Sequence, residues 1–309
     1  MKFDKQLDLY LKYSRILNQP KVFELPVQEA RKKVNSEAFS MGFEKIALNR
    51  VQDSYIIRDD GTKLKTRYYS EGFKVRKPLF IFFHGGGYVY YDIETHDTLC
   101  RFICQQLACH VLSVDYRKAP EHPFPAAYND ALLASEWILA NPDVWQIDPE
   151  RIIIGGDSVG GELARMVLHS LQAKYSFCLL VMLYPVVSYR QDFDSYSQYG
   201  EGYFLDTRLM DSFIRMYYHG EPEKSGLPDC QPVIANNTKA YIAVSGYDVL
   251  KDSTLAYIEN LRKSGKDMQF KIFESLPHNF GLMAGKIRNA QSAMEEIGED
   301  LRSILQTRH

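Results

Sequence analysis

The spacing of apolar residues changes along the chain and separates it into segments of different structure. Up to about residue 50, apolar side chains recur at helical spacing, for example at Ala30, Val34 and Ala38, with prolines Pro20 and Pro26 as breaks. We therefore predict two helices in this part. From residue 51 the period becomes two, where "VQDSYIIR" and "KLKTRYYS" flank the Asp-Gly turn "DDGT". This pattern predicts a β-hairpin.

After the hairpin, short apolar runs alternate with amphipathic segments. We predict strands at 78–83, 110–116, 151–156, 177–185, 239–246 and 268–274. We predict helices near 96–109, 126–140, 159–173 and 286–306, and one that ends near Gly265. The inner strands are continuous apolar runs, which is typical of strands covered on both faces. The pattern therefore predicts an α/β fold with a mostly parallel sheet, helices on each side and the hairpin as its antiparallel edge.

Two segments lie outside this alternation, namely residues 1–50 and a polar, tyrosine-rich insertion at 186–226. Open parallel sheets bind ligands beyond the carboxyl ends of their strands, and the insertion leaves the sheet at such an end. We predict that both segments form a helical cap over that edge, while 51–185 and 227–309 form the core of one compact unit. A merely decorative insertion is the alternative, but its length and its aromatic residues favour a pocket wall.

Composition and charge narrow the classes of function. The chain has 309 residues, of which 45% are hydrophobic and 25% charged, as in ordinary globular proteins. A net charge of -2 gives no electrostatic reason to expect nucleic acid or an anionic membrane as a partner. The N-terminus is too charged for a signal peptide, and no apolar run approaches a membrane span. The five cysteines lack CxxC or metal-like spacing. We therefore expect a cytoplasmic protein with reduced cysteines.

The first candidate for chemistry is the sequence "GDSVG" at 156–160, which matches G-x-S-x-G. Between a strand and a helix, this pattern forms a strained turn that lifts the hydroxyl of its serine, here Ser158, clear of the sheet. The alternative is a glycine-rich turn in which Ser158 is only a helix N-cap. The five-residue pattern alone is weak, but the strand before it and the helix after it favour a nucleophile.

A nucleophilic serine needs a base, and two downstream loops offer partners for it. Asp248 follows the predicted strand 239–246, and His278 follows the predicted strand 268–274. Both positions fall at the carboxyl edge of the sheet, as Ser158 does, and the order serine, acid, histidine is that of α/β-hydrolases. Asp252 is a rival acid, but it fits better as the N-cap of the helix that follows.

A glycine-rich segment, "HGGG" at 84–87, follows another buried strand. Ester cleavage passes through an oxyanion, and loss of one backbone donor to it costs roughly 3–4 kcal/mol. We predict that the amides of Gly86, Gly87 and Val159 are these donors. A flexible loop or a phosphate-binding turn is the alternative, but there is no G-x-G-x-x-G spacing and no P-loop lysine.

From about residue 50 to the C-terminus, the chain resembles the hormone-sensitive lipase family of α/β-hydrolases. The matching motifs are "HGGGYV" followed by "ETHD", "DYRKAPEHPFPAAYND" (115–130), "GGDSVGG" (155–161), "GYDVLKD" (246–252) and "HNF" (278–280). The resemblance implies an eight-stranded, mostly parallel sheet with a helical cap. It also implies that Ser158, Asp248 and His278 form the catalytic triad.

Four positions depart from the family pattern. Val159 stands where the family usually has alanine, which leaves the backbone amide intact. Glu162 stands where asparagine is usual, so a carboxylate lies one helical turn from the serine, and its role is open. Tyr91 and Asn279 occupy positions where glycine is common. None of these changes removes a catalytic atom.

We therefore expect a serine carboxylesterase that acts on small-molecule esters with short acyl chains, without a metal or cofactor. The expected pocket wall consists of aromatic residues near the oxyanion glycines and in the insertion, namely Tyr88, Tyr91, Tyr199, Tyr203 and Phe204. Two alternatives use the same fold: an amidase or formamidase, and a receptor that has lost hydrolysis. The sequence leaves the oligomeric state open between a monomer and a homodimer.

Overall fold

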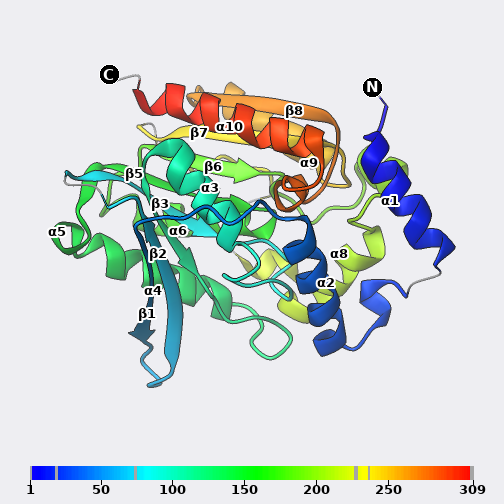
Figure 1. The fold of residues 1–309 in the computed structure, drawn as a ribbon, viewed down its shortest axis with the longest axis horizontal. Coiled ribbons are helices and arrows are strands. Elements are labelled where there is room, and N and C mark those ends of the chain that lie inside the picture. The colour runs from blue at the N-terminus through cyan, green and yellow to red at the C-terminus, as the bar shows by residue number, and fades with distance from the viewer. Residues whose placement is uncertain (1, 18–19, 73–74, 226–228, 236, 307–309) are drawn as a thin grey trace.

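The computed structural model describes residues 2–17, 20–72, 75–225, 229–235 and 237–306 (Figure 1). Within these ranges, eight strands form one sheet in the order β1-β2-β4-β3-β5-β6-β7-β8. The strands are β1 (Arg50–Ile57), β2 (Lys63–Ser70), β3 (Lys77–Phe83), β4 (His110–Val114), β5 (Ile147–Asp157), β6 (Leu179–Leu183), β7 (Lys239–Tyr247) and β8 (Met268–Pro277). The pairs from β4 through β8 are all parallel, which confirms the predicted mostly parallel sheet.

The antiparallel edge of the sheet is the predicted hairpin. β1 pairs antiparallel with β2, which in turn pairs antiparallel with β4. In the turn, the Asp60 carboxylate accepts hydrogen bonds from the backbone N–H and the hydroxyl of Thr62, at 2.9 and 2.6 Å. Such local side-chain contacts are the reason why Asp-Gly sequences close tight turns.

Helices cover both faces of the sheet and explain the continuous apolar strands. They are α3 (Asp97–Leu107), α4 (Ala126–Leu139), α5 (Pro142–Trp145), α6 (Val159–Leu171), α9 (Lys251–Lys263) and α10 (Arg288–Gln306). In β3, Leu79, Ile81 and Phe83 pack into the core that contains α4 and α6. The alternate residues Phe80 and Phe82 pack into the core formed with α3 and α10, which lie side by side in Figure 1. Each face of the strand is therefore buried.

The N-terminal helices and the insertion gather at one end of the molecule (Figure 1). They comprise α1 (Lys5–Ile16), η1 (Val22–Glu24), α2 (Val27–Met41), α7 (Asp194–Tyr199), α8 (Thr207–Tyr218) and η2 (Pro222–Ser225). Lys21 forms an ion pair of 2.9 Å with Asp206, and the ring of Tyr10 stacks on that of Phe204. The two segments thus contact each other directly. The predicted boundary between residues 226 and 227 lies outside the described residues.

The strand bounds differ from the predicted ones: β4 and β6 end earlier than predicted, at Val114 and Leu183, and β5 and β8 are longer by more than one residue. β5 begins at Ile147 because that residue pairs with Lys77 before the register shifts. β8 runs to Pro277, which pairs with Tyr247 after a similar shift. The one-turn helix α5 was also not predicted, because four residues are too few to show a helical period. The extension of β8 places His278 immediately after the last residue of the strand.

Candidate active site

Ser158 lies in a tight turn between β5 and α6. Its backbone angles are φ 55° and ψ −123°, a strained combination for a residue with a Cβ. Glycine is required on both sides, because a Cβ at Gly156 or Gly160 would overlap with the carbonyl oxygen of Phe83. The Ser158 N–H donates to the carbonyl oxygen of Leu183 at 2.9 Å and holds the turn against β6. The G-x-S-x-G segment therefore forms the strained strand-to-helix turn expected from its sequence.

The other two residues of the predicted triad form a chain of contacts with this serine, in which His278 contacts Ser158 and Asp248 contacts His278. The Nε2 atom of His278 lies 2.9 Å from Oγ of Ser158, and its Nδ1 atom lies 2.7 Å from Oδ2 of Asp248. The second carboxylate oxygen of Asp248 accepts a hydrogen bond from the Leu250 N–H at 3.0 Å. All three side chains are buried. One imidazole thus joins the hydroxyl to a carboxylate that is itself held in place.

The prediction that Asp252 is the N-cap of the following helix is wrong. Helix α9 begins at Lys251, so Asp252 lies inside its first turn. Its carboxylate accepts a hydrogen bond from the backbone N–H of Ser195 at 2.8 Å, in the first turn of α7. The Ser195 hydroxyl in turn donates to the carbonyl oxygen of Val249. Asp252 therefore anchors the insertion to the loop that carries Asp248.

The three predicted oxyanion residues meet beside the serine. Gly86 and Gly87 have φ angles of 104° and 63°, in the region that favours glycine. Their loop is fixed by Gly85, whose N–H donates to the Asp157 carboxylate at 2.9 Å. Gly86, Gly87 and Val159 all line the cavity onto which the serine opens.

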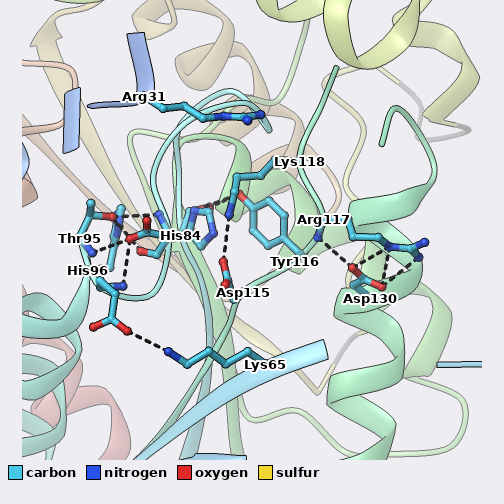
Figure 2. Close-up of polar contacts among 12 residues, drawn as sticks. Arg31, Lys65, His84, Thr95, His96, Asp115, Tyr116, Arg117, Lys118 and Asp130 are labelled. Atoms are coloured by element: carbon cyan, nitrogen blue, oxygen red, sulfur yellow. Dashed lines mark hydrogen bonds and ion pairs between the residues drawn. The ribbon is translucent and has the colours of Figure 1, made fainter. Parts of the chain in front are cut away.

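Polar residues that pack against the glycine loop support it, although the sequence did not indicate a role for them. His84 stacks on Tyr116 with 4.2 Å between ring centroids, and the Tyr116 hydroxyl donates to the His84 carbonyl oxygen at 2.7 Å (Figure 2). Burial holds the pKa of His84 well below its ordinary value, so its ring is neutral. Nε2 of His96 lies 3.2 Å from the Asp157 carboxylate, and both side chains are fully buried. All four residues lie within the motifs quoted above, but the sequence does not show which of these segments meet, because they lie far apart along the chain.

A cavity with about 1050 Å³ of empty volume, open in part to solvent, adjoins the serine and the histidine. Of the predicted wall residues, Tyr88, Tyr91 and Phe204 line it. Further aromatic residues that were not predicted as wall residues also line it, and four of them are Tyr189, Phe213, Tyr217 and Tyr218. Three of these four belong to α8. On an amphipathic helix, residues that line a cavity and residues that pack in a core have the same spacing.

The prediction that Tyr199 and Tyr203 belong to the pocket wall is wrong, because neither residue lines this cavity. Tyr203 packs edge to face against Phe3 with 5.3 Å between ring centroids. The ring centroid of Tyr199 lies 5.3 Å from that of Tyr247, the last residue of β7. These rings join the N-terminal segment to the insertion and the sheet. The sequence could not separate them from cavity residues, since both kinds bury aromatic surface.

The described residues contain no group of three or more His, Cys, Asp or Glu side chains that could hold a metal ion. The five cysteines are free thiols, and four of them are buried. Over the same described ranges, no helix combines the length and the apolar character that a membrane span requires.

Comparison with known proteins identifies the relatives of this site. A family described as alpha/beta hydrolase fold matches residues 80–282. Lipase 2 of Moraxella sp. (strain TA144) is 34% identical over 74% of this chain and 62% of that protein. Carboxylic ester hydrolase LipN of Mycobacterium tuberculosis is 34% identical over 71% of this chain and 61% of that protein. The chain spans about three fifths of the length of these two relatives.

Other relatives match over a larger share of their length. The arylesterase of Saccharolobus solfataricus is 32% identical over 90% of both chains. Gibberellin receptor GID1A of Arabidopsis thaliana is 29% identical over 71% of this chain and 67% of that protein. The crystal structure of a hyperthermophilic esterase from the archaeon Pyrobaculum calidifontis matches with a TM-score of 0.87 and 26% identity, over 99% of this chain and 100% of that chain.

Proposed function

Because the chain belongs to the hormone-sensitive lipase family of α/β-hydrolases, we propose that it is a serine carboxylesterase for esters with short acyl chains. The proposal depends above all on one observation. A single imidazole, that of His278, lies 2.9 Å from the Ser158 hydroxyl and 2.7 Å from the Asp248 carboxylate. This is the geometry that a serine needs in order to lose its proton as it attacks.

In the first step, Oγ of Ser158 attacks the carbonyl carbon of the ester. The Oγ–H bond breaks, its proton moves to Nε2 of His278, and an Oγ–C bond forms. The carbonyl oxygen takes up the electron pair and becomes an oxyanion. Asp248 accepts a hydrogen bond from Nδ1–H, which selects the tautomer with a free Nε2 and stabilises the imidazolium. The buried position of Asp248 strengthens this interaction, because little water competes for it.

The oxyanion needs donors that are in place before the reaction. We assign this function to the backbone N–H groups of Gly86, Gly87 and Val159, which line the cavity beside the serine. Val159 is the first residue of α6, whose N-terminal dipole also favours negative charge there. Each such donor contributes roughly 3–4 kcal/mol to the stability of the transition state.

The remaining steps release the products. The oxyanion collapses, the bond to the alcohol oxygen breaks, and His278 gives its proton to the departing alcohol. The acyl group is now bound to Ser158. Water then loses a proton to His278 and attacks the acyl carbon. In the second collapse the Oγ–C bond breaks, the proton returns from His278 to Oγ of Ser158, and the acid is released. These steps use side chains and amides of this chain together with one water molecule.

The walls near the serine support a preference for short acyl groups. The ring of Phe213 lies directly against Gly87, so closely that a Cβ on this glycine would overlap with it. Tyr88 and Tyr91 line the same cavity. A closed wall rejects each further methylene by about 1–3 kcal/mol. Phe213 belongs to α8 in the insertion, so we assign the insertion a function as a cap over the acyl site.

Two rival functions share this fold. An amidase would use the same groups, and the match to gibberellin receptor GID1A favours consideration of a receptor. Against the receptor stands the triad, whose three members are all present and in contact. One experiment separates the three functions. We would compare hydrolysis of p-nitrophenyl acetate with that of the corresponding p-nitroanilide, and measure the affinity for the intact ester in the Ser158→Ala variant.

We expect the ester to be turned over much faster than the anilide. Faster turnover of the anilide would make the protein an amidase. Tight, reversible binding of a small molecule without turnover of either compound would favour the receptor.

A further inference from the structure

Glu162, whose role the sequence left open, lies one helical turn after Ser158 on α6 and is 4% exposed. Its carboxylate accepts hydrogen bonds from three tyrosine hydroxyls: Tyr189 at 2.5 Å, Tyr88 at 2.8 Å and Tyr218 at 3.4 Å. The three tyrosines come from different segments, respectively the chain after β6, the loop after β3 and the end of α8. One carboxylate thus joins the helix behind the nucleophile to three other parts of the molecule.

Stability alone does not explain a carboxylate at this position. Removing a carboxylate from water is costly unless hydrogen bonds replace the lost hydration. Here burial raises the pKa of Glu162, and the bonds from Tyr189 and Tyr88 oppose that rise. An apolar side chain of similar volume would fill the same space without this cost. The hydrogen bonds of Glu162 have a consequence that packing alone would not supply.

That consequence concerns Tyr88, which directly follows the two oxyanion glycines. Its hydroxyl lies 2.8 Å from the Glu162 carboxylate and 3.4 Å from the carbonyl oxygen of Val159. The side chain of Tyr88 therefore connects the glycine loop to the first turn of α6. These are the two segments that carry the proposed oxyanion donors. This connection adds to the bond from the Gly85 N–H to Asp157, which joins the glycine loop to the end of β5.

The ring of Tyr88 is held independently of its hydroxyl. It stacks on Tyr217 of α8 with 3.8 Å between ring centroids. A change that removes only the hydroxyl therefore leaves the ring in its packing position. This makes the hydrogen bond to Glu162 accessible to a clean experimental test.

We propose that Glu162 is a positioning residue that, through Tyr88, fixes the glycine loop against the N-terminus of α6 and so sets the geometry of the oxyanion hole. This inference rests on the proposed function, because it requires an oxyanion to form there. The oxyanion arises only during the reaction, so its misplacement lowers kcat while KM stays nearly constant. A merely structural role would instead lower stability and leave kcat unchanged.

The central variant is Tyr88→Phe, which removes the link and keeps the ring. We expect kcat on p-nitrophenyl acetate to fall between about tenfold and about a hundredfold, because small misplacements of reacting groups cost up to that factor. We expect KM to change by less than about twofold, since the substrate ground state carries no oxyanion. Glu162→Gln keeps an acceptor oxygen at the same position, so it retains more of the wild-type kcat than Glu162→Leu does.

The matched control is Tyr68→Phe. The hydroxyl of Tyr68 donates a hydrogen bond of the same length, 2.8 Å, to the carbonyl oxygen of Trp145, and the residue is equally buried. Tyr68 lies on β2 and does not line the cavity. We expect this variant to lose a similar amount in Tm and to keep its kcat. The comparison separates the loss of a buried hydrogen bond from the loss of oxyanion geometry.

A second readout measures the geometry directly. An aryl boronic acid forms a tetrahedral adduct with the serine and imitates the transition state. We expect its affinity to fall in Tyr88→Phe by the same factor as kcat, while the affinity for the product alcohol is unchanged. The inference is overturned if kcat and boronic acid affinity in Tyr88→Phe both stay within about twofold of wild type while Tm falls as in the control.

This failure is distinguishable from failure of the proposed function. Full activity of Ser158→Ala would refute the serine mechanism itself, whatever the tyrosine variants do. An inactive Ser158→Ala together with an unaltered Tyr88→Phe would refute only the function of Glu162. If Glu162→Leu fails to fold, Tyr88→Phe alone decides, because its ring preserves the packing.

Discussion

Oγ of Ser158 and Nε2 of His278 lie 2.9 Å apart although 120 residues separate them in the sequence. The parallel sheet accounts for this contact. Ser158 follows β5 and His278 follows β8, and parallel strands place their carboxyl ends at one edge. The order and direction of the strands therefore bring these two residues together. The chemistry depends on the loops that follow the strands at this edge.

Substitutions of Asp248 and Asp252, which lie four positions apart, test which aspartate is the acid of the triad. We predict that Asp248→Asn lowers kcat by roughly 10⁴, because the amide can no longer hold the imidazole in its working tautomer. Asp252→Asn weakens one hydrogen bond to Ser195 and lowers stability by about 1 kcal/mol, with little effect on kcat. Steady-state kinetics and urea unfolding of both variants give the comparison. The reverse order in kcat would move the catalytic acid to Asp252.

Alanine substitutions of two helical glycines test the geometry of the turn that carries Ser158. We predict that Gly160→Ala destabilises the fold by about 1–3 kcal/mol or more, since its Cβ would overlap with the backbone of Phe83. Gly298→Ala in α10 is the control, because its Cβ would meet Gln106 at an ordinary distance of 3.4 Å. There, alanine stabilises the helix by about 0.5–1 kcal/mol. Thermal unfolding measures both, and equal stability of the two variants would contradict the geometry of the turn.

The stability of the fold decreases in mild acid. Burial lowers the pKa of His110 to about 4, whereas an unfolded histidine titrates near about 6.5. Between these values the unfolded chain binds more protons, so the free energy of unfolding rises with pH. Stability is lost as the pH falls below about 6.5, and the loss continues down to about pH 4. By about pH 5 the lost stability amounts to about 2 kcal/mol.

Urea unfolding at about pH 7.5 and about pH 5 checks this prediction with His110→Gln as the comparison. The variant cannot take up the proton, so its loss of stability over this interval is smaller than that of the wild type. Equal losses in the two proteins would show that His110 does not contribute to the acid sensitivity.

Acyl length tests the closed wall beside the oxyanion glycines. We predict that kcat/KM on p-nitrophenyl esters is highest between acetyl and butyryl and falls sharply beyond, by about 1–3 kcal/mol for each methylene that the wall rejects. Phe213→Ala, which removes the ring next to Gly87, shifts the maximum to longer chains. A wild-type maximum at octanoyl, or a jump in rate once the ester forms micelles, would identify a lipase instead.

Much of the fold could be predicted because its signals are local. The continuous apolar runs and the helical spacing near Ala30 and Val34 reflect burial of neighbouring residues. The Asp-Gly turn instead reflects backbone geometry, because Gly61 adopts a positive φ of 80° at an exposed position. Strand ends were less predictable. The last residues of β8 are recruited by a register shift against Tyr247, and such shifts leave no periodic pattern in the sequence.

The candidate site also has features that the sequence predicts and features that it does not. The contact between Ser158, His278 and Asp248 could be predicted because each follows a strand at the same edge, and the close approach of the glycine loop because that approach excludes a Cβ. The cavity walls could not be found reliably. Tyr203 faces Phe3 and not the cavity, a distinction that depends on which rings the folded chain brings together. The contacts of Tyr88, Tyr189 and Tyr218 with Glu162 were missed for the same reason.

The most direct test of the account is whether Ser158 carries the acyl group during turnover. Acid quenching of the reaction with p-nitrophenyl acetate, followed by peptide mass spectrometry, would detect an acetyl group on this residue. We predict acetylation of Ser158 in the wild type, none in Ser158→Ala, and a kcat in that variant lower by on the order of 10⁶. A variant that keeps more than about a hundredth of the wild-type kcat, or an acetyl group on a different residue, would contradict the account.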